Sequence, residues 1–292
     1  MDDRRTISGR AALASHRLVG WIYWDPVGIA GYEALGVPDG AGYYIATRGA
    51  PLGAAGADVV AAAFFSIHPD FVRLGIELCE QHTTFEAAAG ARDAAVRAGL
   101  EAYAPDVCDG LAALGDRLWA VADALPLSGR VLFAAHRRWP RPDDPLVSAW
   151  LAVNCLREWR GDTHWAIQIA DGISGTAAGV LDGAWRAYDD DWLPRSRGAD
   201  DAAIDAAIDE LGARGFITDG AVNAAGVAHR QALEDRLDDR TAITWDLLGE
   251  EATAAFLDLV EPVGPALMAR VDATAGPKWM PAGRDRPPRA SG

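Results

Sequence analysis

Cysteine is scarce in this chain of 292 residues, and the three that occur, Cys79, Cys108 and Cys155, are widely spaced and odd in number. They form no CxxC pair, so the spacing indicates neither a disulfide framework nor a cysteine zinc site. HExxH, HxxxH and tight His/Asp clusters are missing as well, and so are GxGxxG and P-loop motifs. We therefore expect no bound metal, and the sequence leaves any cofactor unidentified.

Long apolar runs are also missing. The longest, such as residues 59–65, fall far short of the roughly 20 residues that a membrane-spanning helix needs. The first ten residues lack the apolar segment of a secretory signal. We expect a cytoplasmic protein with no membrane partner.

Positive charge is in short supply. The chain has 27 Lys and Arg against 42 Asp and Glu, and its formal net charge is −15. Because such a chain repels phosphate backbones, the composition predicts no nucleic-acid partner. The 11 tryptophans, in contrast, are an excess. They fit either an aromatic core or an aromatic-lined pocket, and composition alone does not choose between these.

Apolar residues recur at spacings of three and four along most of the chain, which predicts a mainly α-helical protein. Two short segments break this pattern: residues 49–53 read as a turn, and 130–134 read as a short strand inside a proline-rich loop. The predicted helices of this first part cover residues 10–35 with a break near Asp25-Pro26, 57–65, 70–82, 84–103, 106–124, 145–170 and 174–188.

The last third has the order helix, tight hairpin, helix, which is the layout of a winged helix. Residues 201–214 read as a helix, Asp219-Gly220 is a strong hairpin dipeptide, and helices follow at 225–248 and 250–271. We expect an N-terminal helical domain (residues 1–140), a C-terminal winged-helix-like domain (141–275) and a disordered tail (276–292) that is rich in proline and arginine.

The charge of the predicted recognition helix argues against DNA binding. Residues 201–214 contain one arginine against four carboxylates that would face phosphates, namely those of Asp201, Asp205, Asp209 and Glu210. The hairpin contains no lysine or arginine. These residues favour a winged helix that serves as a dimer or ligand scaffold.

The helix predicted at 145–170 carries the main candidate site. Arg157 and His164 fall on one stripe at helical spacing, and Glu158 and Asp162 share the adjoining face. These charges lie among apolar residues, so burial would require pairing. One interpretation is a structural Arg–carboxylate network. The other is a pocket in which Arg157 or Arg160 binds an anion, His164 carries a proton, and Asp162 or Glu158 orients the histidine.

Three further residues are candidates for the same pocket. Arg48 lies beside the predicted turn and either adds a second cation or holds carbonyl groups of that turn. His68 precedes Pro69 where a helix breaks, and it either points into a cavity or caps the following helix. Trp159 is a candidate ligand-binding residue, whose ring would form part of an aromatic wall of the pocket. His136, in the proline-rich loop, reads as part of a solvated basic segment.

The segment LREWRGDTHW at residues 156–165 resembles the LRExRGDGH motif of an actinobacterial family of helical proteins. The similarity continues at residues 48–53, 63–69 and 214–226, and Thr163 replaces the glycine of the family motif. The resemblance implies a helical N-terminal half and a MarR-like winged helix in the C-terminal half.

Two functions remain open. The first is a small-molecule-binding protein, and possible enzyme, that acts on an anionic metabolite between the two domains, with arginine anchors and His164 as proton carrier. The alternative is a MarR-like, ligand-responsive transcriptional regulator that binds DNA as a dimer. A homodimer is compatible with both.

Overall fold

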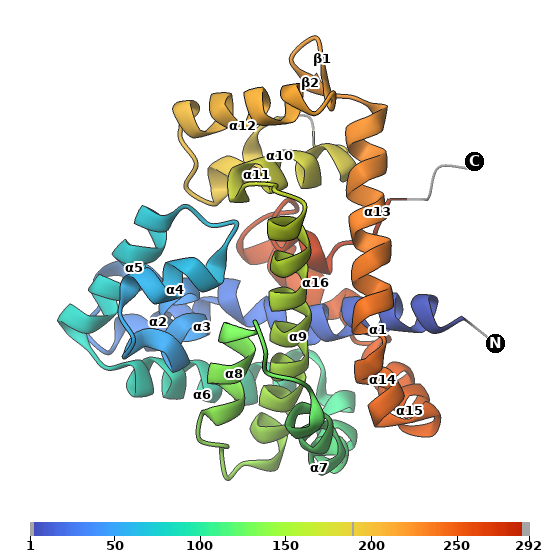
Figure 1. Cartoon of the computed structure of the whole chain (residues 1–292). Coiled ribbons are helices and arrows are strands. Elements are labelled where there is room, and N and C mark those ends of the chain that lie inside the picture. Colours follow the sequence, from blue (N-terminus) through green and yellow to red (C-terminus); the bar gives the residue numbers. More distant parts are fainter. Residues whose placement is uncertain (1–2, 189, 288–292) are drawn as a thin grey trace.

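The structure, a computed structural model, describes residues 3–188 and 190–287. It is mainly helical, as predicted, with one small two-stranded sheet. Figure 1 shows the long helix α9 (Pro145–Ala170) running through the middle of the molecule, with α1 (Arg4–Gly20) crossing it. Asp144 caps α9 by accepting hydrogen bonds from the backbone N–H groups of Leu146 and Val147, and Pro145 occupies its first turn.

The first part of the chain packs beside α1 and α9. Thr84 caps α6 by accepting a hydrogen bond from the backbone N–H of Ala87. Residues 49–53 are not a turn but the last part of α3, which contains Pro51. Apart from α1, this part consists of η1 (Trp21–Trp24), α2 (Pro26–Glu33), η2 (Pro38–Gly40), α3 (Tyr43–Gly53), α4 (Ala57–Phe64), α5 (Pro69–His82) and α6 (Phe85–Tyr103).

The next elements are η3 (Pro105–Val107), α7 (Cys108–Ala124) and α8 (Val131–Arg138), of which α7 and α8 pack against α9 (Figure 1). The strand predicted at 130–134 is wrong, because these residues form the first turns of α8. Their helical start depends on a distant residue: Asp162 of α9 accepts a hydrogen bond from the backbone N–H of Phe133 at 2.9 Å. No local pattern could reveal this cap.

The winged-helix-like unit (residues 175–241) forms the upper part of Figure 1. It contains α10 (Gly175–Trp185), α11 (Trp192–Ser196), α12 (Asp201–Ala213), β1 (Ile217–Thr218), β2 (Ala221–Val222) and α13 (Ala224–Thr241). The predicted hairpin is present, with Ile217 opposite Val222. Asp219 and Gly220 have φ angles of 52° and 78°, the left-handed pair that a tight two-residue hairpin needs. A small core that includes Leu181, Ala207 and Leu211 stabilises the unit.

The predicted helices 225–248 and 250–271 are each broken in two. The four helices are α13, α14 (Ile243–Leu248), α15 (Glu250–Val260) and α16 (Gly264–Thr274). A turn at 261–263 separates α15 from α16. Among the described residues no single helix is both long and apolar enough to cross a membrane; only the bent pair α15 and α16, taken together, reaches the required length and composition.

The C-terminal segment (residues 275–287) is packed against the molecule, which corrects the expectation of a disordered tail as far as residue 287. Met280 is 1% exposed, and Arg17 of α1 donates a hydrogen bond to the carbonyl of Gly283 at 2.8 Å. The segment also contains η4 (Pro281–Gly283). Residues 288–292 lie outside the described part of the chain. A buried methionine anchors this proline- and arginine-rich sequence, whose composition alone indicated disorder.

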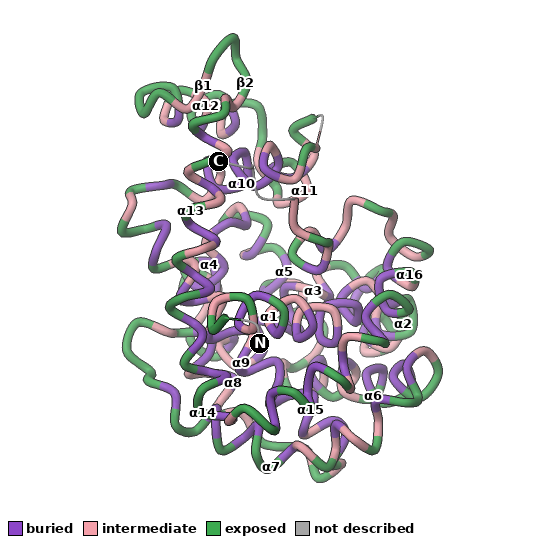
Figure 2. Tube along the Cα trace, turned by 90° about the vertical axis from the view of Figure 1, so that its right-hand side faces the viewer, coloured by how far each residue is buried: buried purple, intermediate pink, exposed green. Residues whose placement is uncertain are grey.

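The largest hydrophobic cluster draws residues from α1, α6, α7, α9, α15 and α16. It therefore continues across residue 140, where the proline-rich segment predicted a domain boundary. Figure 2 shows buried residues in the middle of the molecule and exposed ones along the outer loops and the hairpin. The break in packing comes instead between this cluster and the small core of the winged-helix-like unit.

Candidate functional site

A cavity of about 370 Å³ lies where α1, α3, α9, the winged-helix-like unit and the C-terminal segment meet. Five of the 11 tryptophans line it, namely Trp24, Trp165, Trp192, Trp245 and Trp279. Trp21, Trp150 and Trp159 are instead buried in the main core. The tryptophan excess thus supplies both a core and a pocket wall.

Aromatic rings continue from one segment to the next along the cavity. Trp24 stacks on Tyr44 with ring centroids 5.7 Å apart, and its ring also lies 5.7 Å from that of Trp279. Trp279 meets Trp192 edge-on at 5.2 Å. This aromatic row joins η1, α3, α11 and the C-terminal segment, so the wall exists only in the folded protein.

A bidentate ion pair forms part of the wall. Arg48 Nε and Nη2 donate to the two carboxylate oxygens of Glu158 at 2.8 and 2.7 Å, and Arg157 Nη2 donates to Glu158 Oε1 at 2.7 Å. Glu158 is fully buried. Burial alone would raise the pKa of this carboxyl, but the positive charges of Arg157 and Arg48 hold it well below its ordinary value. Glu158 is therefore a fixed anion that positions two arginines.

His136 supports this pair from behind. Its Nε2 donates to the carbonyl of Arg48 at 2.9 Å, and Asn154 Nδ2 donates to its Nδ1 at 3.3 Å. The ring is fully buried, and burial lowers the pKa of His136 to about 4. The prediction of a solvated basic loop is wrong here, because α8 turns this face of the segment into the core.

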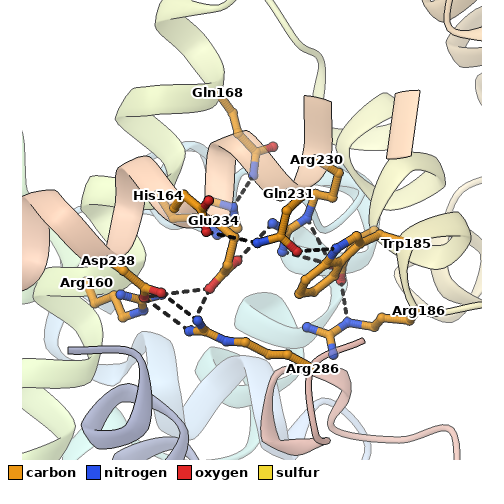
Figure 3. Close-up of polar contacts among 12 residues, drawn as sticks. Arg160, His164, Gln168, Trp185, Arg186, Arg230, Gln231, Glu234, Asp238 and Arg286 are labelled. Atoms are coloured by element: carbon orange, nitrogen blue, oxygen red, sulfur yellow. Dashed lines mark hydrogen bonds and ion pairs between the residues drawn. The ribbon is translucent and has the colours of Figure 1, made fainter. Parts of the chain in front are cut away.

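A second group of charges, the ionic network, surrounds α13 (Figure 3). It consists of Arg160, Asp182, Arg186, Arg230, Glu234, Asp238 and Arg286. Arg230 donates to Glu234 at 2.8 Å and pairs with Asp182 at 2.9 Å, and Arg160 pairs with Glu234 at 2.7 Å. The network joins α9, α10, α13 and the C-terminal segment. The positive charges of Arg186 and Arg230 hold the pKa of Asp182 well below its ordinary value, against the effect of burial.

Arg286 brings the C-terminal segment into this network. Its guanidinium lies 2.5 Å from Asp238 Oδ2 and 2.9 Å from Glu234 Oε1. The positive charges of Arg230, Arg160 and Arg286 hold the pKa of Glu234 well below its ordinary value, against the effect of burial. The ion pairs of Arg286 therefore fix the segment to α13, and the buried Met280 anchors it separately.

Of the residues singled out from the sequence, Arg48, Arg157, Arg160 and His164 line the cavity. The helical stripe predicted on α9 thus faces a common space. His164 Nε2 accepts a hydrogen bond from Gln168 Nε2 at 2.6 Å, and its ring stacks on Trp165. Burial, together with the charge of Arg230, lowers the pKa of His164 to about 3, so the ring is neutral near pH 7.

The other four candidates lie elsewhere. Asp162 caps α8, Trp159 donates its Nε1–H to the carbonyl of Pro126 at 3.0 Å, and Glu158 lies behind the arginines. His68 accepts a long hydrogen bond from the N–H of Asp70 and so caps α5. Neither Asp162 nor Glu158 orients His164, because two and six positions on a helix turn side chains to different faces.

Burial raises the pKa of Asp162 to about 7 despite the hydrogen bond from Phe133 N–H. A carboxyl group whose pKa lies near 7 has an acidity suited to a catalytic proton carrier. The side chain of Asp162 reaches from α9 to the start of α8, where it accepts a hydrogen bond from a backbone N–H group that has no partner within α8. Its role is therefore structural.

Sequence reasoning missed several cavity residues: Ser15, His16, Tyr23, Arg186 and Arg197. None belongs to a motif, and they come from α1, η1 and the turns that follow α10 and α11. His16 faces the arginines: burial and then the charges of Arg157 and Arg48 lower the pKa of its ring well below its ordinary value. Only the tertiary structure places these residues together.

Six buried donors of the cavity wall have no hydrogen-bond partner among the residues that the structure describes. They are Ser15 Oγ, Tyr23 OH, Tyr43 OH, Arg157 Nε, Trp165 Nε1 and Arg186 Nη1. Buried polar groups without partners are costly, so each such group calls for water or a bound molecule. Over the same described residues, no group of three or more His, Cys, Asp or Glu side chains could hold a metal ion.

A model of a helix-turn-helix family matches residues 8–274. The chain belongs to this family. No curated protein and no solved structure matches the chain. The membership confirms a helical protein of helix-turn-helix type over most of the sequence, and the helices and hairpin of the winged-helix-like unit are consistent with it.

Family membership contradicts the expectation of no nucleic-acid partner, because the helix-turn-helix is a DNA-binding motif. That expectation was based on the net charge and on the acidic helix α12. Net charge describes the whole chain, and it does not determine the charge of the one surface that meets DNA.

Proposed function

We propose that this protein is a ligand-responsive transcriptional regulator, which binds DNA through the winged-helix-like unit and a small molecule in the cavity. Membership in the helix-turn-helix family supports the first half of the proposal. The cavity, with its aromatic row and unpartnered donors, supports the second. The resemblance to MarR-like proteins further suggests a homodimer on DNA, with the hairpin as the wing.

The observation that carries the proposal is the double role of α13. At its start, Asn223 caps the helix and donates a hydrogen bond to the carbonyl of Gly215 at 2.9 Å, so α13 follows the hairpin. Two and three turns later, Arg230 and Glu234 line the cavity. Because one rigid helix contacts both places, a ligand that changes the bonds of Arg230 also changes the position of the hairpin.

Helix α10 strengthens this connection. Its Asp182 bonds Arg230 of α13 and Arg186, and both arginines line the cavity. The start of α10 lies against the turn between α4 and α5, where Phe65 adopts a left-handed φ of 41°. Such a conformation is uncommon for a phenylalanine and requires support from its surroundings. The winged-helix-like unit thus has two connections to the rest of the molecule: the arginines of the cavity and the turn between α4 and α5.

The first experiment measures DNA binding by the purified protein. A pool of random duplexes is selected at low salt, and the selected duplex is titrated by fluorescence anisotropy at several salt concentrations. We expect binding that weakens steeply as salt rises. If no duplex is bound at low salt, the proposal fails.

Matched variants test the DNA-facing surface. Asp205 is exposed on α12, whereas Asp109 is exposed on α7 at the opposite end of the molecule. If α12 enters the groove, Asp205→Asn removes a charge that repels phosphates, and DNA affinity rises several-fold at low salt. Asp109→Asn leaves affinity unchanged. Equal effects of the two variants would contradict the placement of α12 on DNA.

A further inference from the structure

We propose that the cavity binds a planar aromatic anion, with its ring against the aromatic row and its negative group at Arg157, Arg186 and Arg197. This inference deepens the proposed function by naming the ligand class. It rests on that function only in taking the cavity as the ligand site, and it needs no DNA. Three independent observations support it: the unpartnered donors, the excess of arginine and the aromatic row.

The unpartnered groups of the wall favour a ligand rich in acceptors. Arg157 Nε, Arg186 Nη1 and Trp165 Nε1 can only donate hydrogen bonds, and the hydroxyl groups of Ser15, Tyr23 and Tyr43 can do so. The side chains of Arg157 and Arg186 are 9% and 8% exposed. Donors this deeply buried form strong hydrogen bonds with a charged acceptor.

The charges around the cavity favour an anion over a neutral molecule or a cation. Seven arginines line it: Arg48, Arg157, Arg160, Arg186, Arg197, Arg230 and Arg286. Within the described part of the chain, the carboxylates paired with them are those of Glu158, Asp182, Glu234 and Asp238. Three positive charges are therefore left over in a protein whose formal net charge is −15. Buried charge of one sign requires a counter-charge.

Arg197 is the clearest case. Its guanidinium forms no ion pair with a residue that the structure describes, and burial lowers its pKa from the ordinary value. Its backbone is nevertheless held in place, because its carbonyl accepts a hydrogen bond from the N–H of His68 at 2.7 Å. The charge of Asp182 raises this pKa, and those of Arg186 and Arg230 lower it. An arginine that is held in place and has no ion pair of its own is suited to bind a carboxylate in bidentate fashion.

The aromatic row favours a flat, unsaturated ligand. Trp24, Tyr44, Trp192 and Trp279 are only half-buried, so their rings still have faces to offer. A cavity of about 370 Å³ falls within the ~300–1,000 Å³ typical of small-molecule sites, and it has room for a two-ring compound. An anion without a ring, such as inorganic phosphate, would leave these faces uncovered.

Isothermal titration calorimetry with matched probes tests the inference on the full-length protein. The probes are 2-naphthoate, its neutral isostere 2-naphthamide, the cation 2-naphthylmethylammonium, and acetate and inorganic phosphate as anions without rings. We expect 2-naphthoate to bind at least ten-fold more tightly than the amide, and the cation and the two simple anions to bind far more weakly still.

Two arginine variants locate the anion. Arg197→Met removes an unpaired guanidinium, and we expect the affinity for 2-naphthoate to fall at least ten-fold while that for 2-naphthamide changes little. Arg195→Met is the matched control, because Arg195 lies two residues earlier, is half exposed and pairs with Asp201. Its affinity for 2-naphthoate stays as in the parent. Thermal melts of both variants establish that they fold.

Several results would overturn the inference. They are equal affinity for naphthoate and naphthamide, tighter binding of the cation, binding of phosphate or acetate as tight as that of naphthoate, equal effects of the two variants, or no binding of any naphthyl probe. DNA binding is measured separately. Naphthoate binding without DNA binding would refute the proposed function alone, and DNA binding without naphthoate binding would refute this inference alone.

Discussion

Arg48 and Glu158 are 110 residues apart in the sequence, yet the guanidinium of one donates two parallel hydrogen bonds, of 2.8 and 2.7 Å, to the carboxylate of the other. The pair joins α3 to α9 at the cavity, which Arg48 lines. Arg157 shares the same carboxylate, which leaves its Nε as an open donor. One buried anion therefore positions two of the cations that the cavity presents.

Removal of Glu158 should destabilise the protein strongly. Glu158→Ala leaves Arg48 and Arg157 buried without a counter-charge, and breaking a buried pair in this way costs about 3–5 kcal/mol of the free energy of unfolding. Urea denaturation measures the loss. Glu101→Ala is the control, because the Arg97–Glu101 pair lies on the surface, where an ion pair contributes little. Similar losses for the two variants would show that the buried pair has no special role.

Asp162 should act as a cap rather than as a proton carrier. Asp162→Ala removes the acceptor of the Phe133 N–H group, and we expect a loss of about 1 kcal/mol, typical of a missing helix cap. Asp162→Asn keeps an acceptor oxygen and should retain most of the stability. If the asparagine variant is as unstable as the alanine variant, the capping role is wrong.

Asp162 also predicts a dependence of stability on pH. Its pKa rises from 3.8 to about 7 on folding, so between these values the folded state binds the proton more tightly than the unfolded state. Stability from this residue is therefore lost as pH rises from 4 to 7. The difference in free energy of unfolding between Asp162→Asn and the parent should shift in favour of the variant over that range. Denaturation at four pH values checks the sign.

His136 predicts the opposite slope. Its pKa falls from 6.5 to about 4 on folding, because the neutral ring is buried. Its contribution is complete above pH 6.5 and is lost as pH falls towards 4, with a slope of up to roughly 1.4 kcal/mol per pH unit. His136→Gln should reduce this acid sensitivity. His82→Gln, at an exposed position, serves as control and should keep the parent profile.

Arg286 should control how firmly the C-terminal segment covers the cavity. Arg286→Ala removes the ion pairs to Asp238 and Glu234, so we expect faster amide hydrogen exchange over residues 276–287 and little change in α7. Arg10→Ala is the comparison, because Arg10 pairs with Glu261 on the surface. Unchanged exchange in the segment would show that its other contacts, such as the burial of Met280 and the hydrogen bond from Arg17 to Gly283, hold it without Arg286.

Local sequence patterns were sufficient to predict much of the helical framework. Asp144 and Pro145 mark the start of α9, Thr84 caps α6, and Asp219-Gly220 forms the hairpin, because each of these signals acts within a few residues. The signals failed where a distant residue decided the conformation. Residues 130–134 became helix through Asp162, and residues 276–287 became ordered through Met280 and Arg286.

The stripe of Arg157 and His164 could be predicted because helical spacing places residues on faces without reference to the rest of the fold. The sequence by itself also determined the chain's acidity, its many tryptophans and its scarcity of cysteine. Only the tertiary structure decided that Arg48, Arg186 and Arg197 meet around one cavity while Asp162 turns away from it. The reason is physical: a side chain's charge depends on its own chemistry, but its partner depends on which helices pack together.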